Sequence, residues 1–414
     1  MKTFILLSAV MAVALASNNE IEKILNDGNN VFTSKFFEEV VKEKPGESVV
    51  MSAFSVMQPL AQLALASVGH SHDEILKVIG LPNDNVTKEV FPLVNSRLRA
   101  VKGVELKMAN KIYLPLDAKI KEDFGALSKS VFGSEFKNID FAEPEPAAKE
   151  INEWVEDHTN HRIKNLVNSD SFSDNTRAVL VNALYFKGSW LDKFDKALTT
   201  DRDFHVSKDK TVQIPTMFKK AEFKFAESHE LDAKLLELPY EGEEASMLII
   251  LPNEIDGLPA LQEKLKVPSA LETAIDNMYK VEVNVYLPKF KIETQIDLKK
   301  ILMSVGVNDL FDSATARLNN LLENESGLFV SNAIQKAFIE VNEEGAEAAA
   351  ANEYDTGRSG GNYVPELKVD RPFLFHLKVE EKSLFTGIFG LGMDHATPKA
   401  PPHSCVMNGG NPDL

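Results

Sequence analysis

Apolar residues recur at helical spacing in the N-terminal part of the chain. Ile21, Ile24, Leu25, Phe32, Phe36 and Val40 recur at helical spacing, and a second apolar run extends from about Val56 to Val68. Ser71 and Glu74 have the spacing of a capping box for a further short helix. Around 147–167 the pattern is that of an amphipathic helix. We therefore predict that this part of the chain is mainly helical.

Strand patterns dominate the rest of the chain. Residues 106–114 and 281–287 are apolar at nearly every second position, which is typical of strands with one buried face. Residues 178–186 and 247–251 are almost continuously apolar, as expected for strands covered on both faces. Strands and helices are mixed rather than regularly alternating, and no linker rich in Pro, Gly or Ser divides the chain. The sequence therefore predicts a single α+β domain.

Composition and charge exclude several classes of protein. The 414 residues are 44% hydrophobic and 26% charged, which is a globular composition and not that of a disordered or fibrous chain. The net charge of −17 repels nucleic acid and an anionic membrane surface, so we expect neither as a partner. The single cysteine, Cys405, rules out an internal disulfide. We expect a monomer.

The first sixteen residues have the features of a secretory signal peptide. Lys2 is followed by a short apolar run and then by Ala14-Leu15-Ala16, a cleavage signal of small residues. The apolar run is too short to span a bilayer. We therefore predict a signal peptide at 1–16 and a secreted, extracellular protein.

The remaining chain is assigned to one domain at 17–394 and a flexible C-terminal tail at 395–414, which is rich in Pro, Gly and Asn. Asn85 and Asn324 each begin an Asn-x-Ser/Thr sequon, so both are candidate glycosylation sites in a secreted protein.

No local motif indicates an enzyme. No signature ties Ser171, Ser189 or Ser359 to a histidine and a carboxylate. Phosphate-binding loops and dinucleotide fingerprints are absent as well. We expect no catalytic site and no cofactor.

Two histidine pairs have a spacing that suits a metal ion, His70-x-His72 and His158-x-x-His161. His158 shares an apolar face with Trp154, so a packed histidine beside a solvated one is the better interpretation of the second pair, and we expect no metal. A basic stretch could contact a sulfated glycosaminoglycan, although a solvated surface is favoured. Its members are Arg97, Arg99, Lys102, Lys107 and Lys111.

The segment from Lys336 to Asn362 changes character abruptly. Its first part alternates like a strand, whereas 346–351 carries almost only methyl side chains, too small to hold a helix by packing. The polar, glycine-rich residues 352–362 predict a long exposed loop, and such loops are usually functional. Small side chains suit a strand that must enter a formed sheet, and Gly345 supplies backbone freedom where the chain turns.

At these residues the sequence resembles the serpin family, and the resemblance covers essentially the whole mature chain. Several separate motifs occur in the family's order, and the sequence as a whole is most similar to the secreted haemolymph serpins of moths. The motifs are Glu343 to Ala351, Asn182 to Trp190, Pro215-Thr216-Met217, Leu287-Pro288-Lys289-Phe290, Arg371 to Phe375 and Phe385-Thr386-Gly387.

The resemblance implies a fold of three β-sheets and about nine helices with an exposed reactive-centre loop at about 343–362. It implies a suicide-type inhibitor of serine proteases rather than an enzyme. The protease forms a covalent acyl complex with the cleaved loop, which then inserts into the central sheet. A non-inhibitory serpin that binds or carries a ligand is the alternative. The hinge implied for insertion comprises Glu343, Glu344, Gly345, Ala346, Glu347, Ala348, Ala349, Ala350 and Ala351.

The reactive bond has two candidates. The family's common spacing from Glu343 places the cut between Ser359 and Gly360, and a loop one residue shorter places it between Arg358 and Ser359. Chemistry favours Arg358-Ser359, because an exposed arginine fills an acidic trypsin-like pocket whereas serine offers little binding energy. The first alternative would imply an elastase-like target.

The resemblance also assigns residues to the region through which the sheet must open. Ser52, Ser55 and Asn182 match a polar shutter region, and Trp190 matches a tryptophan near the insertion point. Many members have a histidine in the strand before the hinge where this chain has Gln335, which still offers a hydrogen-bonding side chain.

Overall fold

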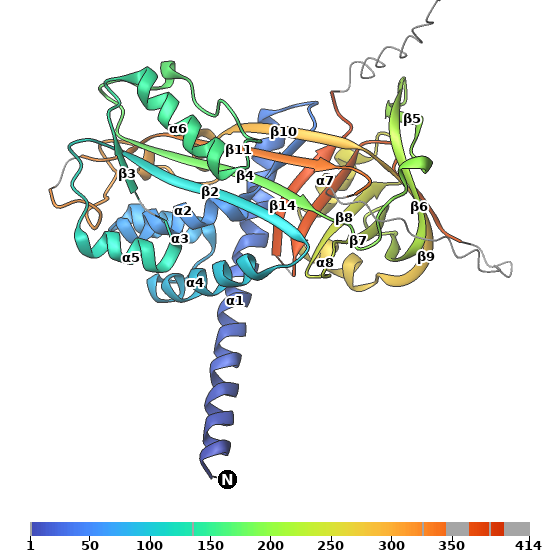
Figure 1. The fold of residues 1–414 in the computed structure, drawn as a ribbon, viewed down its shortest axis with the longest axis horizontal. Helices are drawn as coiled ribbons and strands as arrows, with labels where there is room; N and C mark the ends of the chain where they lie inside the picture. The colour runs from blue at the N-terminus through green and yellow to red at the C-terminus, as the bar shows by residue number, and fades with distance from the viewer. Residues whose placement is uncertain (1, 135, 325–326, 345–363, 381, 393–414) are drawn as a thin grey trace, which may run out of the picture.

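Two β-sheets surrounded by helices make up the described part of the chain (Figure 1). The computed structural model describes residues 2–134, 136–324, 327–344, 364–380 and 382–392, and for 2–17 and 268 it describes the backbone alone. The helices there are α1 (Lys2–Glu43), α2 (Ala53–Ala66), α3 (His70–Ile79), α4 (Asp84–Ala100), α5 (Glu122–Phe132), α6 (Pro144–His158), α7 (Leu258–Leu265), α8 (Pro268–Asp276) and α9 (Leu298–Ser304), with 3-10 turns η1 (Ser169–Ser171), η2 (Lys196–Leu198) and η3 (Asp309–Phe311).

The α+β class is confirmed, and the strands form two hydrogen-bonded sheets rather than three. A single long strand joins what would otherwise be separate sheets, because β6 pairs with β5 near its start, with β9 along its middle and with β7 near its end. The strands are β1 (Val49–Met51), β2 (Val104–Pro115), β3 (Phe136–Ile139), β4 (Ala178–Gly188), β5 (Thr200–Ser207), β6 (Lys210–Ser228), β7 (Ala233–Pro239), β8 (Ala245–Pro252), β9 (Tyr279–Pro288), β10 (Phe290–Asp297), β11 (Val330–Val341), β12 (Glu366–Lys368), β13 (Phe373–Val379) and β14 (Lys382–Phe389).

The five-stranded sheet has the order β10-β11-β4-β2-β3, which places β4 in its centre. The continuously apolar residues 178–186 were expected to be covered on both faces, and all of them are buried. Strands β11 and β4 run parallel to each other, whereas β10 pairs antiparallel with β11 and β2 pairs antiparallel with β4. The middle of this sheet is therefore a boundary between two parallel strands.

The main core lies between the nine-stranded sheet, one face of the five-stranded sheet and the helices α1 to α5. The predicted signal peptide continues into the same helix as the residues after it, and this N-terminal part of α1 extends away from the rest of the molecule (Figure 1). Among the side chains of α1 that the structure describes, Leu25, Phe32 and Phe36 are buried. None of the described helices combines the length and the apolar character needed to cross a membrane.

A second, smaller core lies between α6 and the other face of the five-stranded sheet (Figure 1). Helix α6 contributes Ala147, Ile151 and Val155, all of which are at most 1% exposed. They pack with Tyr113 of β2, with Val179, Val181 and Ala183 of β4, and with Ile334 and Phe338 of β11. Helix α6 thus covers the boundary between the two parallel strands.

Two local sequence predictions were wrong. Ser71 and Glu74 do not form a capping box, because Gly69 caps α3 while Ser71 Oγ donates to the Thr315 carbonyl and the Glu74 carboxylate accepts from the Asp309 amide. The helix predicted over 147–167 ends at His158. Beyond it Asn160 and His161 adopt positive φ angles of 51° and 57°, which do not continue a right-handed helix.

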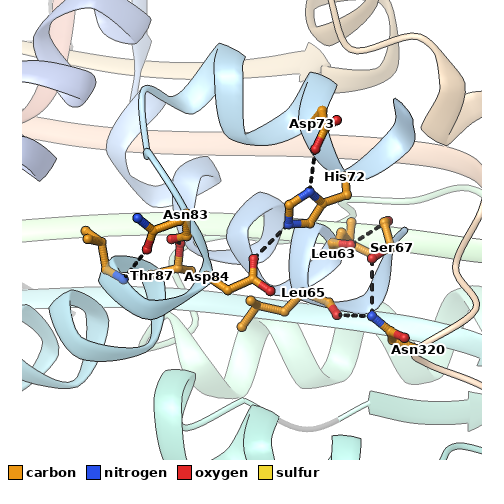
Figure 2. A network of polar contacts seen from close by, with 10 residues as sticks. Leu63, Leu65, Ser67, His72, Asp73, Asn83, Asp84, Thr87 and Asn320 are labelled. Atoms are coloured by element: carbon orange, nitrogen blue, oxygen red, sulfur yellow. Dashed lines mark hydrogen bonds and ion pairs between the residues drawn. The ribbon is translucent and has the colours of Figure 1, made fainter. Parts of the chain in front are cut away.

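A polar network fastens α3 to the start of α4 (Figure 2). The His72 ring lies between two carboxylates, with Nε2 2.7 Å from Asp84 Oδ1 and Nδ1 2.8 Å from Asp73 Oδ1. Asn83 caps α4 by accepting from the Val86 amide. Partial burial alone would lower the pKa of His72, but the hydrogen bonds to Asp84 and Asp73 outweigh it and raise the pKa. The imidazolium can donate to both carboxylates, whereas neutral imidazole can donate to only one.

This network makes part of the stability dependent on pH. Because the folded-state pKa of His72 lies above its ordinary value of 6.5, its stabilisation is present below that value and is lost as the pH rises through the folded-state pKa. We expect His72→Gln to lower the free energy of unfolding by about 1 kcal/mol at pH 6 and by clearly less at pH 9, measured by urea titration.

The exposed His229 has no carboxylate partner within the described ranges and provides the control. His229→Gln should leave stability nearly unchanged at both pH values. An equal loss for His72→Gln at pH 6 and pH 9 would show that the imidazolium does not contribute.

Candidate functional site

The boundary between β4 and β11, called the seam below, is placed so that it can accept another strand. The two strands are in parallel register from the pair Ala178–Val330 to the pair Phe186–Ile339. Residues 342–344 lead from the end of β11 to residue 345. A segment that turned back after Glu344 and ran along the seam would be antiparallel to both neighbours, which is the pairing that strands joined by a turn adopt.

Four residues assigned from the resemblance meet in one buried network at the seam. Gln335 of β11 and Asn182 of β4 are register partners, and Gln335 Nε2 donates to Asn182 Oδ1 at 2.6 Å. The same amide group donates to the Ser52 carbonyl at 2.8 Å, while its Oε1 accepts from the Ser52 amide at 3.2 Å. Ser55 Oγ donates to Asn182 Oδ1 at 3.0 Å. All four residues are at most 1% exposed.

Asn110 of β2 also belongs to this network, although the sequence analysis did not identify it. Its Oδ1 accepts from Asn182 Nδ2, and its Nδ2 donates to the Ser55 carbonyl at 3.3 Å. In the sequence Asn110 occupies a polar position of an alternating strand, which suggests a solvated face. The network therefore joins β2, β4, β11 and the start of α2. Deleting one member would leave a buried partner unpaired, at a cost of about 1–3 kcal/mol.

Glu343 is fixed at the end of the seam from which the loop departs. Its side chain is 5% exposed, with Oε2 2.8 Å from Lys289 Nζ and Oε1 accepting from the Thr199 hydroxyl at 2.8 Å. Its carbonyl accepts from the Phe194 amide at 2.9 Å. Burial alone would raise the pKa of Glu343, but the Lys289 ammonium and the Thr199 hydroxyl outweigh it and hold the pKa below its ordinary value. Glu343 therefore stays ionised and anchored.

Trp190 holds the same end of the seam. Its ring stacks on Tyr240 at a centroid distance of 4.4 Å and an interplanar angle of 10°, and its Nε1 donates to the Asn342 carbonyl at 2.8 Å. The Trp190 amide donates to the Glu344 carbonyl, and the Glu344 carboxylate pairs with Lys196. Trp190 thus does more than fill the core, because it binds the backbone of the residues that precede the loop.

Sequence analysis missed the partners that hold the hinge start. Lys289 lies in one of the motifs that carry the resemblance, but the chain gives no indication that it meets Glu343, 54 residues later. Thr199 and Lys196 come from the η2 region and have no motif of their own. These contacts are tertiary, and the sequence pattern carries no signal for them.

Part of the predicted site lies outside the described residues. This applies to the hinge residues Gly345 to Ala351, to the reactive-bond candidates Arg358, Ser359 and Gly360, and to the tail with Cys405. Both sequon asparagines, Asn85 and Asn324, are exposed. Thr87 of the first sequon is buried and donates to the Asn83 carbonyl at 2.9 Å.

Three residues of the basic stretch contact neighbouring side chains. Arg97 pairs with the buried Glu22 at 2.8 Å, Lys107 pairs with Glu105 at 3.5 Å, and Lys111 lies 4.6 Å from the centre of the Trp154 ring. Arg97, Lys107 and Lys111 therefore have separate partners.

Among the described side chains, His70, Glu74 and Asp309 form a group with metal-ligand chemistry. They already satisfy one another, because His70 Nδ1 lies 2.7 Å from Asp309 Oδ2 and the Asp309 amide donates to Glu74. His158, of the second histidine pair, stacks on Trp154 at 4.4 Å and is exposed.

Comparison with known proteins identifies what the chain resembles. The family model described as serpin (serine protease inhibitor) matches residues 27–389. Alaserpin of Manduca sexta is 55% identical over 387 residues, which cover 94% of this chain and 99% of the relative. Antitrypsin of Bombyx mori is 52% identical over 392 residues, covering 94% of this chain and 100% of the relative.

Solved structures share the fold. Serpin48, described as a highly specific serpin of the insect Tenebrio molitor, has a TM-score of 0.81 at 38% identity, covering 89% of this chain and 98% of its own. Human thyroxine-binding globulin in complex with thyroxine has a TM-score of 0.79 at 25% identity, covering 89% of this chain and 98% of its own.

The anchoring of Glu343 leads to a prediction. Glu343→Gln should lower the free energy of unfolding of the uncleaved protein by about 1–2 kcal/mol at pH 7, because the charged hydrogen bond to Lys289 is lost. The folded-state pKa lies below the ordinary 4.5, so the stabilisation is present above that value and disappears as the pH falls through the folded-state pKa. Urea titrations at pH 7 and at about pH 3.5 measure the difference.

Glu340→Gln, near the end of β11, provides the matched control, because Glu340 pairs with Lys291 at 3.0 Å and both side chains are more exposed than Glu343 and Lys289. This variant should lose no more than about 0.5 kcal/mol. Equal losses in the two variants would contradict a special role for Glu343.

Proposed function

The chain belongs to the serpin family, and we propose that it is a secreted inhibitor of trypsin-like serine proteases that traps its target by inserting the cleaved reactive loop into the five-stranded sheet. The observation that carries the proposal is the seam. Two parallel strands are adjacent in the middle of this sheet, and β11 leads directly into the loop. The names of the moth relatives alaserpin and antitrypsin agree with an inhibitory role.

Insertion must separate β4 from β11. Adjacent strands lie about 4.8 Å apart, so a new strand between them doubles this spacing to about 10 Å and breaks the direct contact between Gln335 and Asn182. In exchange, the inserted strand gains hydrogen bonds along both of its edges. The uncleaved state is therefore held kinetically, with a more stable arrangement available once the loop is cut.

The length of the inserted segment explains how a protease would be trapped. About fifteen residues at roughly 3.3 Å each span about 50 Å. A domain of this size has a radius of gyration of about 21 Å, so an acyl-linked protease is carried from one end of the molecule to the other. Deacylation requires sub-ångström placement of the nucleophile and the oxyanion donors, and the pull on the acyl bond disrupts that placement.

The protease class follows from the reactive bond, for which we propose Arg358-Ser359 over Ser359-Gly360. An exposed arginine carries the charge that an acidic specificity pocket binds. Secretion follows from the signal peptide predicted at residues 1–16. A serine protease is then the partner, joined through a covalent acyl bond.

A cavity favours a second candidate function, that of a ligand carrier. It measures about 1050 Å³ and lies between α1, α8 and β13, with Phe37, Ile275 and Leu374 among its apolar lining. Glu22 Oε1 and Asn26 Oδ1 belong to residues of this lining, and they are buried without a hydrogen-bond partner among the described residues. A small apolar molecule with a donor group would suit it. Thyroxine-binding globulin, whose solved structures hold thyroxine, has the same fold.

Incubation with trypsin tests the proposal. We expect an SDS-stable complex with one molecule of trypsin. We also expect a released C-terminal peptide whose mass corresponds to a chain that starts at Ser359. Arg358→Ala should lower complex formation with trypsin by at least about tenfold, because the side chain for the acidic pocket is lost. Mass spectrometry of the peptide and gel densitometry measure both effects.

The outcome separates the two candidate functions. Loop cleavage without a complex, and without a rise in the melting temperature of the cleaved form, would refute insertion and favour the carrier. A peptide that begins at Gly360 would move the reactive bond and change the expected target to an elastase-like protease.

The small side chains of the hinge give a further prediction. Ala348→Arg should turn the protein into a substrate that is cleaved without forming a complex, because a charged side chain would have to be buried on insertion. Ala349→Arg is the matched control, since neighbouring residues of a strand point to opposite faces. Its complex yield should fall less. Unchanged yield in Ala348→Arg, measured on SDS gels with trypsin, would contradict the insertion model.

A further inference from the structure

Tyr113 carries a buried hydroxyl group that has no hydrogen-bond partner among the described residues. The side chain is 0% exposed and lies in the core between β2 and α6. Its ring meets Trp154 of α6 edge to face at 6.4 Å, and Lys111 Nζ lies 5.6 Å from the ring centre. Burial raises the pKa of Tyr113, and the charge of Glu150 raises it further, so the hydroxyl stays neutral.

An unpaired hydroxyl is unusual at such a place. Nearly all buried polar groups are hydrogen-bonded. A polar group that loses its hydrogen bonds to water on burial, and gains no new partner, lowers the stability of the fold. Phenylalanine would fill the same space without this cost. The hydroxyl therefore weakens the contact between α6 and the sheet relative to a purely apolar core.

The position of Tyr113 connects this weakness to the seam. The core beneath α6 contains Val181 of β4 and Ile334 of β11, which are register partners on opposite sides of the seam. When the strands separate, these two side chains cannot both keep their places under α6. Helix α6 must therefore loosen before a strand can enter, and the strength of its attachment contributes to the barrier.

We propose that the Tyr113 hydroxyl weakens the packing of α6 on the sheet over the seam. The weaker packing makes loop insertion faster than release of the acyl-linked protease. This role rests on the proposed inhibitory function. In this role Tyr113 changes the rate at which β4 and β11 separate, and it acts through the attachment of α6 rather than by binding the protease.

Tyr113→Phe tests this role with two measurements. The uncleaved variant should melt about 1–3 °C higher than the wild type, because the unpaired hydroxyl is removed. Loop insertion should become about threefold to tenfold slower, so more inhibitor molecules are cleaved for each SDS-stable trypsin complex that forms. Titration of trypsin with each variant gives this stoichiometry.

Tyr185→Phe is the matched control. Tyr185 lies on β4, is 4% exposed and has Arg162 beside its hydroxyl. Removing this hydroxyl should not raise the melting temperature.

The outcomes are distinguishable. A lower melting temperature for Tyr113→Phe would overturn the proposal, because it would show that the hydroxyl stabilises the fold. A higher melting temperature with unchanged stoichiometry would overturn the role in insertion. Failure of the wild type to form any complex would instead refute the proposed function, and with it the inhibitory role of Tyr113, while the melting temperature would still report on the hydroxyl.

Discussion

The structure depends on one contact between two parallel strands. Gln335 and Asn182 meet directly across the seam, and they are held from below by Ser52 and Ser55 at the start of α2. Apolar contacts at this place would weaken gradually as the strands moved apart, since they have no preferred direction. Hydrogen bonds between buried amides require defined geometry, and their partners strengthen one another. The hydrogen bonds therefore hold β4 and β11 together against small displacements, and they are lost abruptly once the strands separate.

Two further attachments act along the same boundary from different directions. At the end where the loop departs, Glu343 is held by Lys289 and Thr199, and Trp190 binds the adjoining backbone. Over the seam, α6 packs on side chains from both β4 and β11. These three sets of contacts share few atoms, so they can break one after another. A barrier that is crossed in such steps is lower than one in which every contact breaks at once, and each step can be altered by separate substitutions.

The pattern of the sequence predicted the fold class and most elements, because hydrophobic periodicity is a local property. The alternating residues 281–287 and the continuously apolar residues 178–186 lie in strands of the expected kind. Prediction failed where distant partners decide the local structure, as at Ser71, whose hydroxyl donates to Thr315 instead of capping a helix. The site shows the same division. A motif identified Glu343, but the roles of Lys289 and Asn110 follow only from their contacts in the folded structure.

The order of strands in the nine-stranded sheet determines when this protein can finish folding. Strand β1, at Val49–Met51, pairs with β14, at Lys382–Phe389, and β13 separates β14 from β8. The first and last strands of the described residues, β1 and β14, are thus neighbours near one edge of the sheet. During synthesis β1 and β8 must wait until β13 and β14 have emerged from the ribosome, with apolar surfaces uncovered meanwhile. Truncation near the C-terminus would therefore remove the strands that join the N-terminal half to the rest of the sheet.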